Sequence, residues 1–372
     1  MIPVCVPSVG EKELAYVTDC LKTNWISSKG KYVTAFEERF SEYCGVSHGI
    51  ATVNGTAALH LALAAAGVGE GDEVILPSFT MISTAFAVLY CGAIPVVVDA
   101  TPDTWTMDPD RIAEKVTDRT KVILPVHIYG HPCDMEPVMR IAREHDLVVV
   151  EDAAEAHGAL YRGRKAGGIG HMGCFSFYAN KIITTGEGGM VVTDDGELAA
   201  RARSLKDLAF DPDRRFLHSA VGFNYRMTNI QAAIGLAQLE RIDDFVARRR
   251  DHAASYARLL RHIPGLTLPV EKPWARNVYW MYGMLVGDAF GVPRDTLAVR
   301  LSEEGIETRV FFHPMHAQPV FRKRGLFAGE RCPVSERLGA QGLYLPSGSD
   351  LNGEEILFVC GKIREISAGE KE

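Results

Sequence analysis

Between about residues 50 and 200, apolar residues form short unbroken runs that are separated by longer amphipathic stretches. Strands buried on both faces of a parallel sheet are apolar throughout, whereas strands with one solvent face alternate. The runs therefore predict a mostly parallel sheet, and the stretches between them predict helices, which together form an α/β domain. The expected strands are 74–76, 95–98, 121–126 and 147–150, and the expected helices are about 81–90 and 135–145.

The pattern changes in the last third of the chain. A long helical pattern covers residues 229–260 and ends before Pro264-Gly265, because neither residue favours a helix interior. Shorter elements follow, with strands expected at 279–286 and 307–311 and helices at 296–304 and 354–366. We predict a large α/β domain over residues 1–245 and a small α+β domain over residues 246–372.

Composition and charge exclude several classes of protein. The chain has 372 residues, of which 47% are hydrophobic, and its net charge is −7, so it has no bulk electrostatic attraction for nucleic acids or anionic membranes. None of the eight cysteines forms a CxxC pair, which argues against a zinc ribbon or a disulfide framework. We find no apolar run of 18 residues and no signal-peptide pattern, and therefore expect a cytoplasmic protein.

The first candidate for chemistry is Lys181. It follows the aromatic segment Phe175-Ser176-Phe177-Tyr178 and precedes the turn Gly186-Glu187-Gly188-Gly189 and an expected strand at 190–193. A desolvated lysine loses its charge easily and can then act as a nucleophile toward a carbonyl group. The alternative is a lysine on a solvated loop, which is the commoner situation for this residue type. The aromatic neighbours favour the reactive lysine.

The second candidate is Asp152, which follows Glu151 at the end of a buried strand. A side chain at the carboxyl end of such a strand points into the crevice where α/β proteins bind ligands. A carboxylate there can pair with a protonated ring nitrogen of a cofactor. A strand-end acid also commonly caps the helix that follows, and Asp152 alone does not decide between the two roles.

The third candidate is the segment Asn54-Gly55-Thr56, which leads into a strong helical pattern at 59–66. The first turn of a helix presents unpaired N–H groups, and with the threonine hydroxyl these can bind a phosphate group. Ser176 would add a second hydroxyl. The alternative is an ordinary helix cap, which is the commoner meaning of such residues.

A phosphate site, a strand-end carboxylate and a flanked lysine occur in the order found in fold-type I pyridoxal-phosphate (PLP) enzymes. The chain resembles, nearly end to end, the DegT/DnrJ/EryC1/StrS family of nucleotide-sugar aminotransferases. The resemblance implies an α/β fold like that of aspartate aminotransferase, with a mostly parallel mixed sheet and a small C-terminal α+β domain. It rests on the segments around Asp152 and Lys181 and on Asn24-Trp25-Ile26-Ser27-Ser28-Lys29-Gly30, Asn54-Gly55-Thr56-Ala57-Ala58-Leu59, Val126-His127-Ile128-Tyr129-Gly130, Gly222-Phe223-Asn224-Tyr225-Arg226-Met227 and His313-Pro314-Met315-His316-Ala317-Gln318-Pro319.

The resemblance implies PLP as the cofactor. Lys181 would hold it covalently and move the proton during transamination, and Asp152 would pair with the nitrogen of its ring. The phosphate group of the cofactor would be bound by Gly55, Thr56 and Ser176.

The resemblance further implies a homodimer with shared active sites, in which Asn224 reaches the cofactor phosphate of the neighbouring subunit. Glu155 would lie near the phenolic oxygen of the cofactor, where many relatives carry glutamine or histidine. Met81 would pack on the cofactor ring, where many relatives carry an aromatic residue; a thioether also packs well on a ring face. Glu155 and Met81 are therefore departures from the common family pattern.

The substrates implied by the resemblance are L-glutamate as the amino donor and a nucleotide-linked keto-sugar as the acceptor. The runs at 25–30 and 178–189 favour the subgroup that aminates C4 of GDP-4-keto-6-deoxy-mannose. UDP- and dTDP-linked keto-sugars, and amination at C3, stay open. Lys29, Arg309 and His316 are candidates to contact the substrate, although a lysine or arginine is more often an ordinary surface charge.

The sequence argues against three other functions. A sugar dehydratase of the same family carries histidine in place of the lysine, so Lys181 argues against it. A non-catalytic PLP-binding regulator would be expected to carry a DNA-binding module or a basic arm, and an oxidoreductase of the Rossmann type would need a strand–GxGxxG–helix unit in the first half. Neither pattern is present.

His127, His131 and Cys133 lie close together in the sequence and are candidates for a metal site. The Tyr-Gly-His-Pro segment between them is typical of a turn, where the helical spacing that brings i and i+4 together does not apply. We predict that these residues are structural and that the protein has no metal site.

Overall fold

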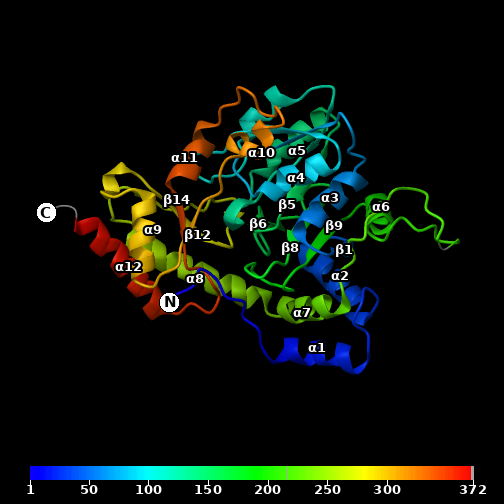
Figure 1. Ribbon diagram of the computed structural model, residues 1–372, viewed down its shortest axis with the longest axis horizontal. Helices are drawn as coiled ribbons and strands as arrows, with labels where there is room; N and C mark the ends of the chain where they lie inside the picture. Colours follow the sequence, from blue (N-terminus) through cyan, green and yellow to red (C-terminus); the bar gives the residue numbers. More distant parts are fainter. Residues whose placement is uncertain (215, 370–372) are drawn as a thin grey trace.

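The computed structural model describes residues 1–214 and 216–369, and its centre is a seven-stranded sheet (Figure 1). Its strands lie in the order β1-β9-β8-β5-β4-β2-β3. Strand β9 runs in the direction opposite to that of the other six strands. The predicted mostly parallel mixed sheet is therefore confirmed. The bounds are β1 His48–Thr52, β2 Glu73–Pro77, β3 Ile94–Val98, β4 Thr120–Ile123, β5 Val148–Asp152, β8 Met172–Ser176 and β9 Gly189–Thr193.

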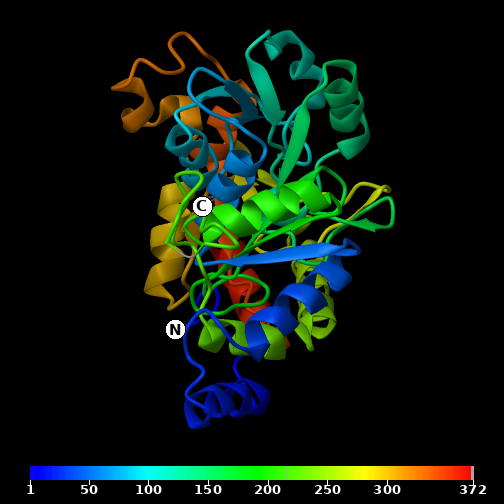
Figure 2. The ribbon, with the colours of Figure 1, turned by 90° about the vertical axis from the view of Figure 1, so that its right-hand side faces the viewer.

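Helices cover both faces of this sheet, because its strands are apolar on both sides. In β2, Val74 and Leu76 join the core that includes the buried face of α3, whereas Ile75 joins a second cluster that contains the apolar side of α5. The helices of this part of the chain are α1 Glu11–Lys22, α2 Lys31–Cys44, α3 Gly55–Ala65, α4 Ile82–Tyr90, α5 Met135–Glu144, α6 Gly196–Lys206 and α7 Asn229–Leu239. Helix α1 stands away from the sheet and packs on α7 (Figure 2).

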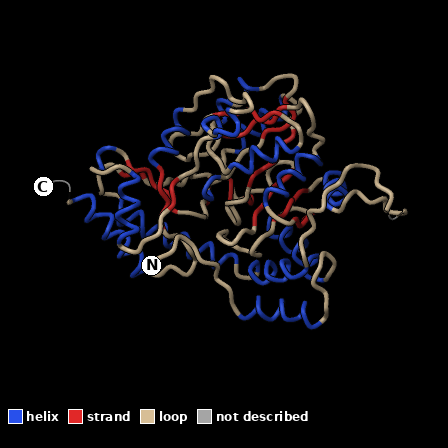
Figure 3. The backbone as a smooth tube through the Cα atoms, viewed as in Figure 1, coloured by secondary structure: helices blue, strands red, loops and turns tan. Residues whose placement is uncertain are grey.

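A second, smaller sheet lies beside the first, and Figure 3 shows the strands of the two sheets in separate groups. It is antiparallel throughout, in the order β10-β12-β14-β13, and has its own hydrophobic core with helices α8, α9 and α12. The bounds are β10 Leu266–Thr267, β12 Tyr282–Val286, β13 Arg309–Val310, β14 Gly342–Leu345, α8 Ile242–Leu260, α9 Arg294–Glu303, α10 Pro319–Arg322, α11 Pro333–Gln341 and α12 Gly353–Ala368. Three short strands, β6 Leu160–Tyr161, β7 Arg164–Lys165 and β11 Ala275–Arg276, form a third sheet.

Several boundaries differ from those expected. The predicted strand 121–126 ends at Ile123 because Pro125 cannot donate to the ladder, and pairing resumes only as an isolated bridge between Val126 and Asp152. The single helical pattern 229–260 is two helices, α7 and α8, separated at residues 240–241. The proposed division into residues 1–245 and 246–372 falls inside α8, so this helix belongs to both parts.

Residues 207–214 and 216–223 project from the body beside α6 (Figure 1). Two isolated antiparallel bridges occur here, between Asp207 and Asn224 and between Phe210 and His218, and the side chains of Phe216 and Val221 are exposed. Within residues 1–214 and 216–369, no helix is both long and apolar enough to cross a membrane.

Candidate active site

A cavity of ≈ 470 Å³ opens at the carboxyl end of the large sheet. Its wall includes the first turn of α3, the start of α4 and the segments that follow β4, β5 and β8. The part of the chain after α8 supplies the remaining wall with Trp280, Phe312 and Tyr344. This is the position in which ligands of open α/β sheets bind, and the volume is in the range of small-molecule sites.

Lys181 lies in the irregular turn after β8 and its side chain is only 11% exposed. Its Nζ atom is 3.9 Å from a carboxylate oxygen of Glu155 and 3.8 Å from the centre of the Trp280 ring. Burial lowers the pKa of Lys181, and the nearby carboxylates of Glu155 and Asp152 oppose this effect. Burial thus favours the neutral amine, the form in which an acid–base catalyst can take up a proton.

Asp152 is the last residue of β5 and is held from two sides. One carboxylate oxygen accepts a hydrogen bond from the Thr84 hydroxyl at 2.8 Å, and the other accepts one from the amide of Ala154 at 3.2 Å. Burial raises the pKa of Asp152, although these hydrogen bonds act in the opposite direction. The carboxylate is fixed in orientation while its negative charge lacks a full counterion.

Glu155 is the second buried acid, and it is 4% exposed. One of its oxygens accepts the amide of Tyr129 at 2.7 Å, and the other faces Lys181. Burial raises the pKa of Glu155 to about 7, with Lys181 opposing the rise. His157 adds no positive charge, because burial lowers its pKa to about 3.

The start of helix α3 also lines the cavity. The Asn54 side chain caps this helix by accepting the amide of Ala57 at 2.8 Å, and the first amides of any helix lack intrahelical partners. Gly55 lies so close to Ser176 that a Cβ atom at this position would be 2.7 Å from the serine Cβ. The small residue thus lets the helix start and the end of β8 approach one another, as a shared phosphate site would require.

The structure brings most of the predicted site residues together and leaves four outside. Lining the cavity are Gly55, Thr56, Met81, Asp152, Glu155, Ser176 and Lys181. Lys29 and Asn224 are exposed elsewhere on the surface, and the Asn224 side-chain oxygen accepts a hydrogen bond from Arg226.

Arg309 and His316, the other two predicted substrate contacts, also lie outside the cavity lining. Arg309 pairs with Glu307 at 2.7 Å. His316 is buried, and its two ring nitrogens are 2.7 Å from the Ser78 hydroxyl and 3.0 Å from a Glu336 oxygen. The position of His316 therefore gives no support to a substrate contact, because its hydrogen-bonding capacity is used within the chain.

Sequence reasoning missed the aromatic wall and the residue that orients Asp152. Trp280 lay within the expected strand 279–286, and Phe312 and Tyr344 lay outside every element expected from the sequence, so nothing marked these residues as part of a site. Thr84 had none, because a threonine in the first turn of a helix is common.

His127 was expected to be structural, and the structure gives it partners within the chain. Its Nε2 is 2.8 Å from Glu151, and its Nδ1 accepts the amide of Cys133 at 3.0 Å, so the ring carries its proton on Nε2. Glu151 also accepts three backbone amides; burial opposes its ionisation, but these bonds and His127 lower its pKa. Among the described residues, no cluster of three or more metal-ligating side chains occurs.

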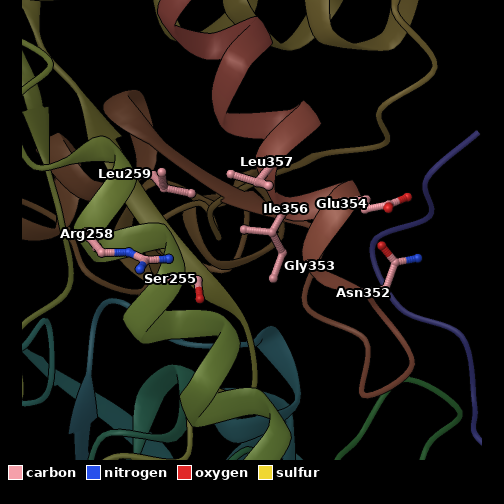
Figure 4. A pocket seen from close by; sticks show the side chains of 8 residues that line it. All are labelled: Ser255, Arg258, Leu259, Asn352, Gly353, Glu354, Ile356 and Leu357. Carbon is pink, nitrogen blue, oxygen red and sulfur yellow. The ribbon is translucent and has the colours of Figure 1, made fainter.

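A second hollow lies between α8 and the first turn of α12 (Figure 4). Its lining contains none of the residues predicted to carry chemistry, so the chemistry belongs to the first cavity. The lining residues are Ser255, Arg258, Leu259, Asn352, Gly353, Glu354, Ile356 and Leu357.

The fold and the cavity together define a PLP-dependent transferase of the aspartate aminotransferase type. Within that class, the chain belongs to the DegT/DnrJ/EryC1/StrS aminotransferase family, whose model matches residues 7–364. It is 48% identical to a GDP-perosamine synthase of Caulobacter vibrioides and 43% identical to one of Escherichia coli O157:H7, in each case over 98% of both chains. Among solved structures it is similar to the aminotransferase TlmJ from Streptoalloteichus hindustanus, with 33% identity, a TM-score of 0.93 and full coverage of both chains.

The residues present fit the cofactor of this family, which is PLP. Two buried carboxylates, Asp152 and Glu155, face the single amine of Lys181, so the site holds more negative than positive charge when both acids are ionised. A cationic ring nitrogen would balance the remaining carboxylate. The first turn of α3 offers the amides that a phosphate group needs.

Proposed function

We propose that this PLP-dependent transaminase transfers the amino group of L-glutamate to C4 of GDP-4-keto-6-deoxy-mannose, giving GDP-perosamine. The two relatives that carry the name GDP-perosamine synthase support the sugar, since they match along nearly the whole chain. The observation that carries the chemistry is the buried amine of Lys181 beside two fixed carboxylates in one cavity.

Each residue of the cavity has a distinct task in this proposal. Lys181 would hold the cofactor, and its buried amine is placed to take up and return the proton that transamination moves. Asp152 keeps the ring nitrogen protonated, and Thr84 fixes the direction of its carboxylate. When bound, PLP acts as the electron sink and carries the amino group between the two substrates.

The remaining cavity residues bind and orient. Gly55, Thr56 and Ser176 would hold the cofactor phosphate, Met81 would pack on its ring, and Glu155 would lie near its phenolic oxygen. The buried aromatic side chains of Trp280 and Tyr344 limit the access of water from the opposite wall, which strengthens every charge interaction within the cavity. Arg309 and Lys29, both exposed, stay candidates for contact with the diphosphate of the substrate.

The proposal is tested by the absorption spectrum of the purified protein, before and after addition of L-glutamate. A band near ~410–430 nm that moves toward ~330 nm on addition of glutamate is the expected result, because the cofactor changes its optical signature when it accepts an amino group. A cofactor band that glutamate leaves unchanged would contradict the proposed donor.

The acceptor is tested separately, with GDP-4-keto-6-deoxy-mannose offered beside UDP- and dTDP-linked keto-sugars. We expect the ~330 nm band to revert with the GDP-sugar, and the product to carry an amino group at C4. Reversion only with a UDP- or dTDP-linked sugar would overturn the GDP assignment while leaving the enzyme class intact.

We also propose that the active form is a homodimer in which Asn224 reaches the cofactor phosphate of the neighbouring subunit. Asn224 is exposed, and it lies beside the projecting residues 207–214 and 216–223 rather than in the cavity of its own chain. Its side-chain oxygen accepts from Arg226, which leaves the Nδ2 group as the donor toward a phosphate of a second copy.

Asn224→Ala is accordingly expected to weaken the binding of PLP by about tenfold, the order expected for one hydrogen bond to a charged group. The measurement is the dissociation constant for PLP, with the assembly state followed by light scattering. Asn352→Ala is the matched control, because Asn352 caps α12 and lies outside the cavity. Unchanged PLP affinity in an intact Asn224→Ala dimer would contradict the shared site.

A further inference from the structure

Trp280 contacts both the side chain and the backbone of the Lys181 region. Its ring face lies 3.8 Å from Nζ of Lys181, and its indole N–H donates a 2.7 Å hydrogen bond to the carbonyl of Asn180. That carbonyl belongs to the peptide bond that joins Asn180 to Lys181. One side chain therefore touches the reactive amine and the backbone that carries it.

The backbone of Lys181 has little regular structure to fix it. Residues 179–183 form turns and bends between β8 and β9, and the Lys181 amide makes a local turn with the Tyr178 carbonyl at 2.9 Å. The lysine side chain has four rotatable bonds, which need further contacts if Nζ is to occupy one place. The indole supplies such a contact at each end of the residue.

Trp280 is itself firmly held. Its carbonyl accepts a 2.7 Å hydrogen bond from the buried guanidinium of Arg249 in α8, and the same nitrogen donates to the carbonyl of Ser347 at 2.7 Å. The Tyr129 ring stacks beside the indole, with centroids 6.2 Å apart and an interplanar angle of 26°. The position of Nζ is thus tied, through Trp280, to the packing of α8 against the small sheet.

We propose that Trp280 is a positioning residue for transamination, which places the Lys181 amine by contacting its ammonium form with the ring face and its peptide bond with the indole N–H. This role rests on the proposed function of Lys181. A cation over an indole face is attracted by the ring quadrupole, and the attraction is strongest where water is excluded. The ring therefore favours the charged amine, whereas burial favours the neutral one.

Most of the other groups that face Lys181 lie at the end of β5 and in the segment that follows it. Asp152 and Glu155 favour the charged amine, and His157 is neutral because burial lowers its pKa to about 3. Tyr344, on β14, faces Glu155, and burial raises its pKa to about 12, so it stays neutral. Removing the indole leaves the two carboxylates in place, so the effect of the ring can be measured against a constant background.

Two substitutions separate the two contacts. Trp280→Phe keeps a ring face and removes the N–H, and Trp280→Leu removes both. With Leu, we expect the pKa of Lys181 to fall by about one unit, because the charged amine loses the ring, and kcat to fall by about ten- to a hundredfold, because Nζ is misplaced. With Phe, we expect the pKa to stay close to that of the unsubstituted protein and kcat to fall several-fold.

The pKa is measured on the full-length protein after removal of the cofactor. Only the neutral amine reacts with trinitrobenzenesulfonate, so the modification of Lys181 is followed against pH by peptide mass spectrometry. Trp274→Leu is the matched control, because Trp274 packs on Tyr161 and His131 and does not line the cavity. This control is expected to leave the Lys181 profile unchanged.

The outcomes separate this inference from the proposed function. Borohydride reduction of the PLP-loaded protein shows whether the cofactor is attached to Lys181; attachment elsewhere would overturn both. Attachment to Lys181 with an unchanged pH profile and kcat in Trp280→Leu would overturn the role of Trp280 alone. If the Leu variant does not fold, the Phe variant decides, since an unchanged kcat after loss of the N–H contact would also overturn it.

Discussion

Lys181→Ala is expected to abolish transamination while the protein still folds. The substitution removes both the attachment point of the cofactor and the acid–base group, and loss of a general acid–base catalyst alone typically costs 10²–10⁴-fold, so we expect a fall in kcat of at least about 10³-fold. Folding should survive, because burial already raises the pKa of Asp152 and Glu155, and these acids can take up protons when the amine is gone. The measurement is single-turnover conversion of the cofactor by glutamate, with circular dichroism to confirm the fold.

Lys165→Ala provides a demanding control for that experiment. Lys165 also lies over an aromatic ring, with Nζ 3.9 Å from the centre of Tyr43, and burial likewise lowers its pKa. It does not line the cavity, so its replacement should leave turnover nearly intact. Normal turnover by Lys181→Ala would exclude the assigned role, and equal losses in both variants would point to a general effect of removing a partly buried lysine.

Lys181 and Asp152 can be proposed as functional residues from the sequence because both signals are local. An acid at the end of an apolar strand and a lysine between aromatic residues and glycines can be recognised without knowing what packs against them. The helix start at Gly55 is recognised in the same way, from the residues that precede an apolar run. These are the positions at which the predicted site and the cavity agree.

The residues that orient these groups depend on contacts between distant parts of the chain. Thr84 lies 68 positions from Asp152, and Trp280 lies 100 positions from Asn180, so neither pairing follows from the sequence around it. His316 shows the converse, because its sequence neighbourhood suggests a ligand contact whereas Ser78, 238 positions away, occupies one of its nitrogens. Tertiary packing, which no local pattern reports, decides each of these three cases.

Asp152→Asn is expected to lower kcat by at least about a hundredfold with little change in structure, since loss of one preorganised electrostatic contact in a buried site typically costs 10²–10³-fold. Asparagine has the same shape, and its amide can donate to Thr84, whose hydroxyl can in turn donate to Thr80 at 3.0 Å. The geometry is thus kept and the negative charge is lost. A neutral residue cannot hold a proton on the ring nitrogen, so the electron sink is weakened. The measurement is kcat, together with the pH dependence of the absorption of the bound cofactor.

Asp99, a second acid at the end of a strand, distinguishes two explanations for Asp152. The charge of Asp152 could act on the cofactor, or its carboxylate could serve only the fold. Asp99 follows β3 and accepts the amides of Val334 and Ser335, which begin α11, but it does not line the cavity. Asp99→Asn should therefore lower the melting temperature, because asparagine offers one acceptor oxygen for the two amides and no charge at the helix start, and it should leave the absorption of the cofactor unchanged. Asp152→Asn should do the reverse. If Asp152→Asn instead lowers the melting temperature and keeps kcat, the carboxylate serves the fold, and the ring nitrogen must obtain its proton from another group.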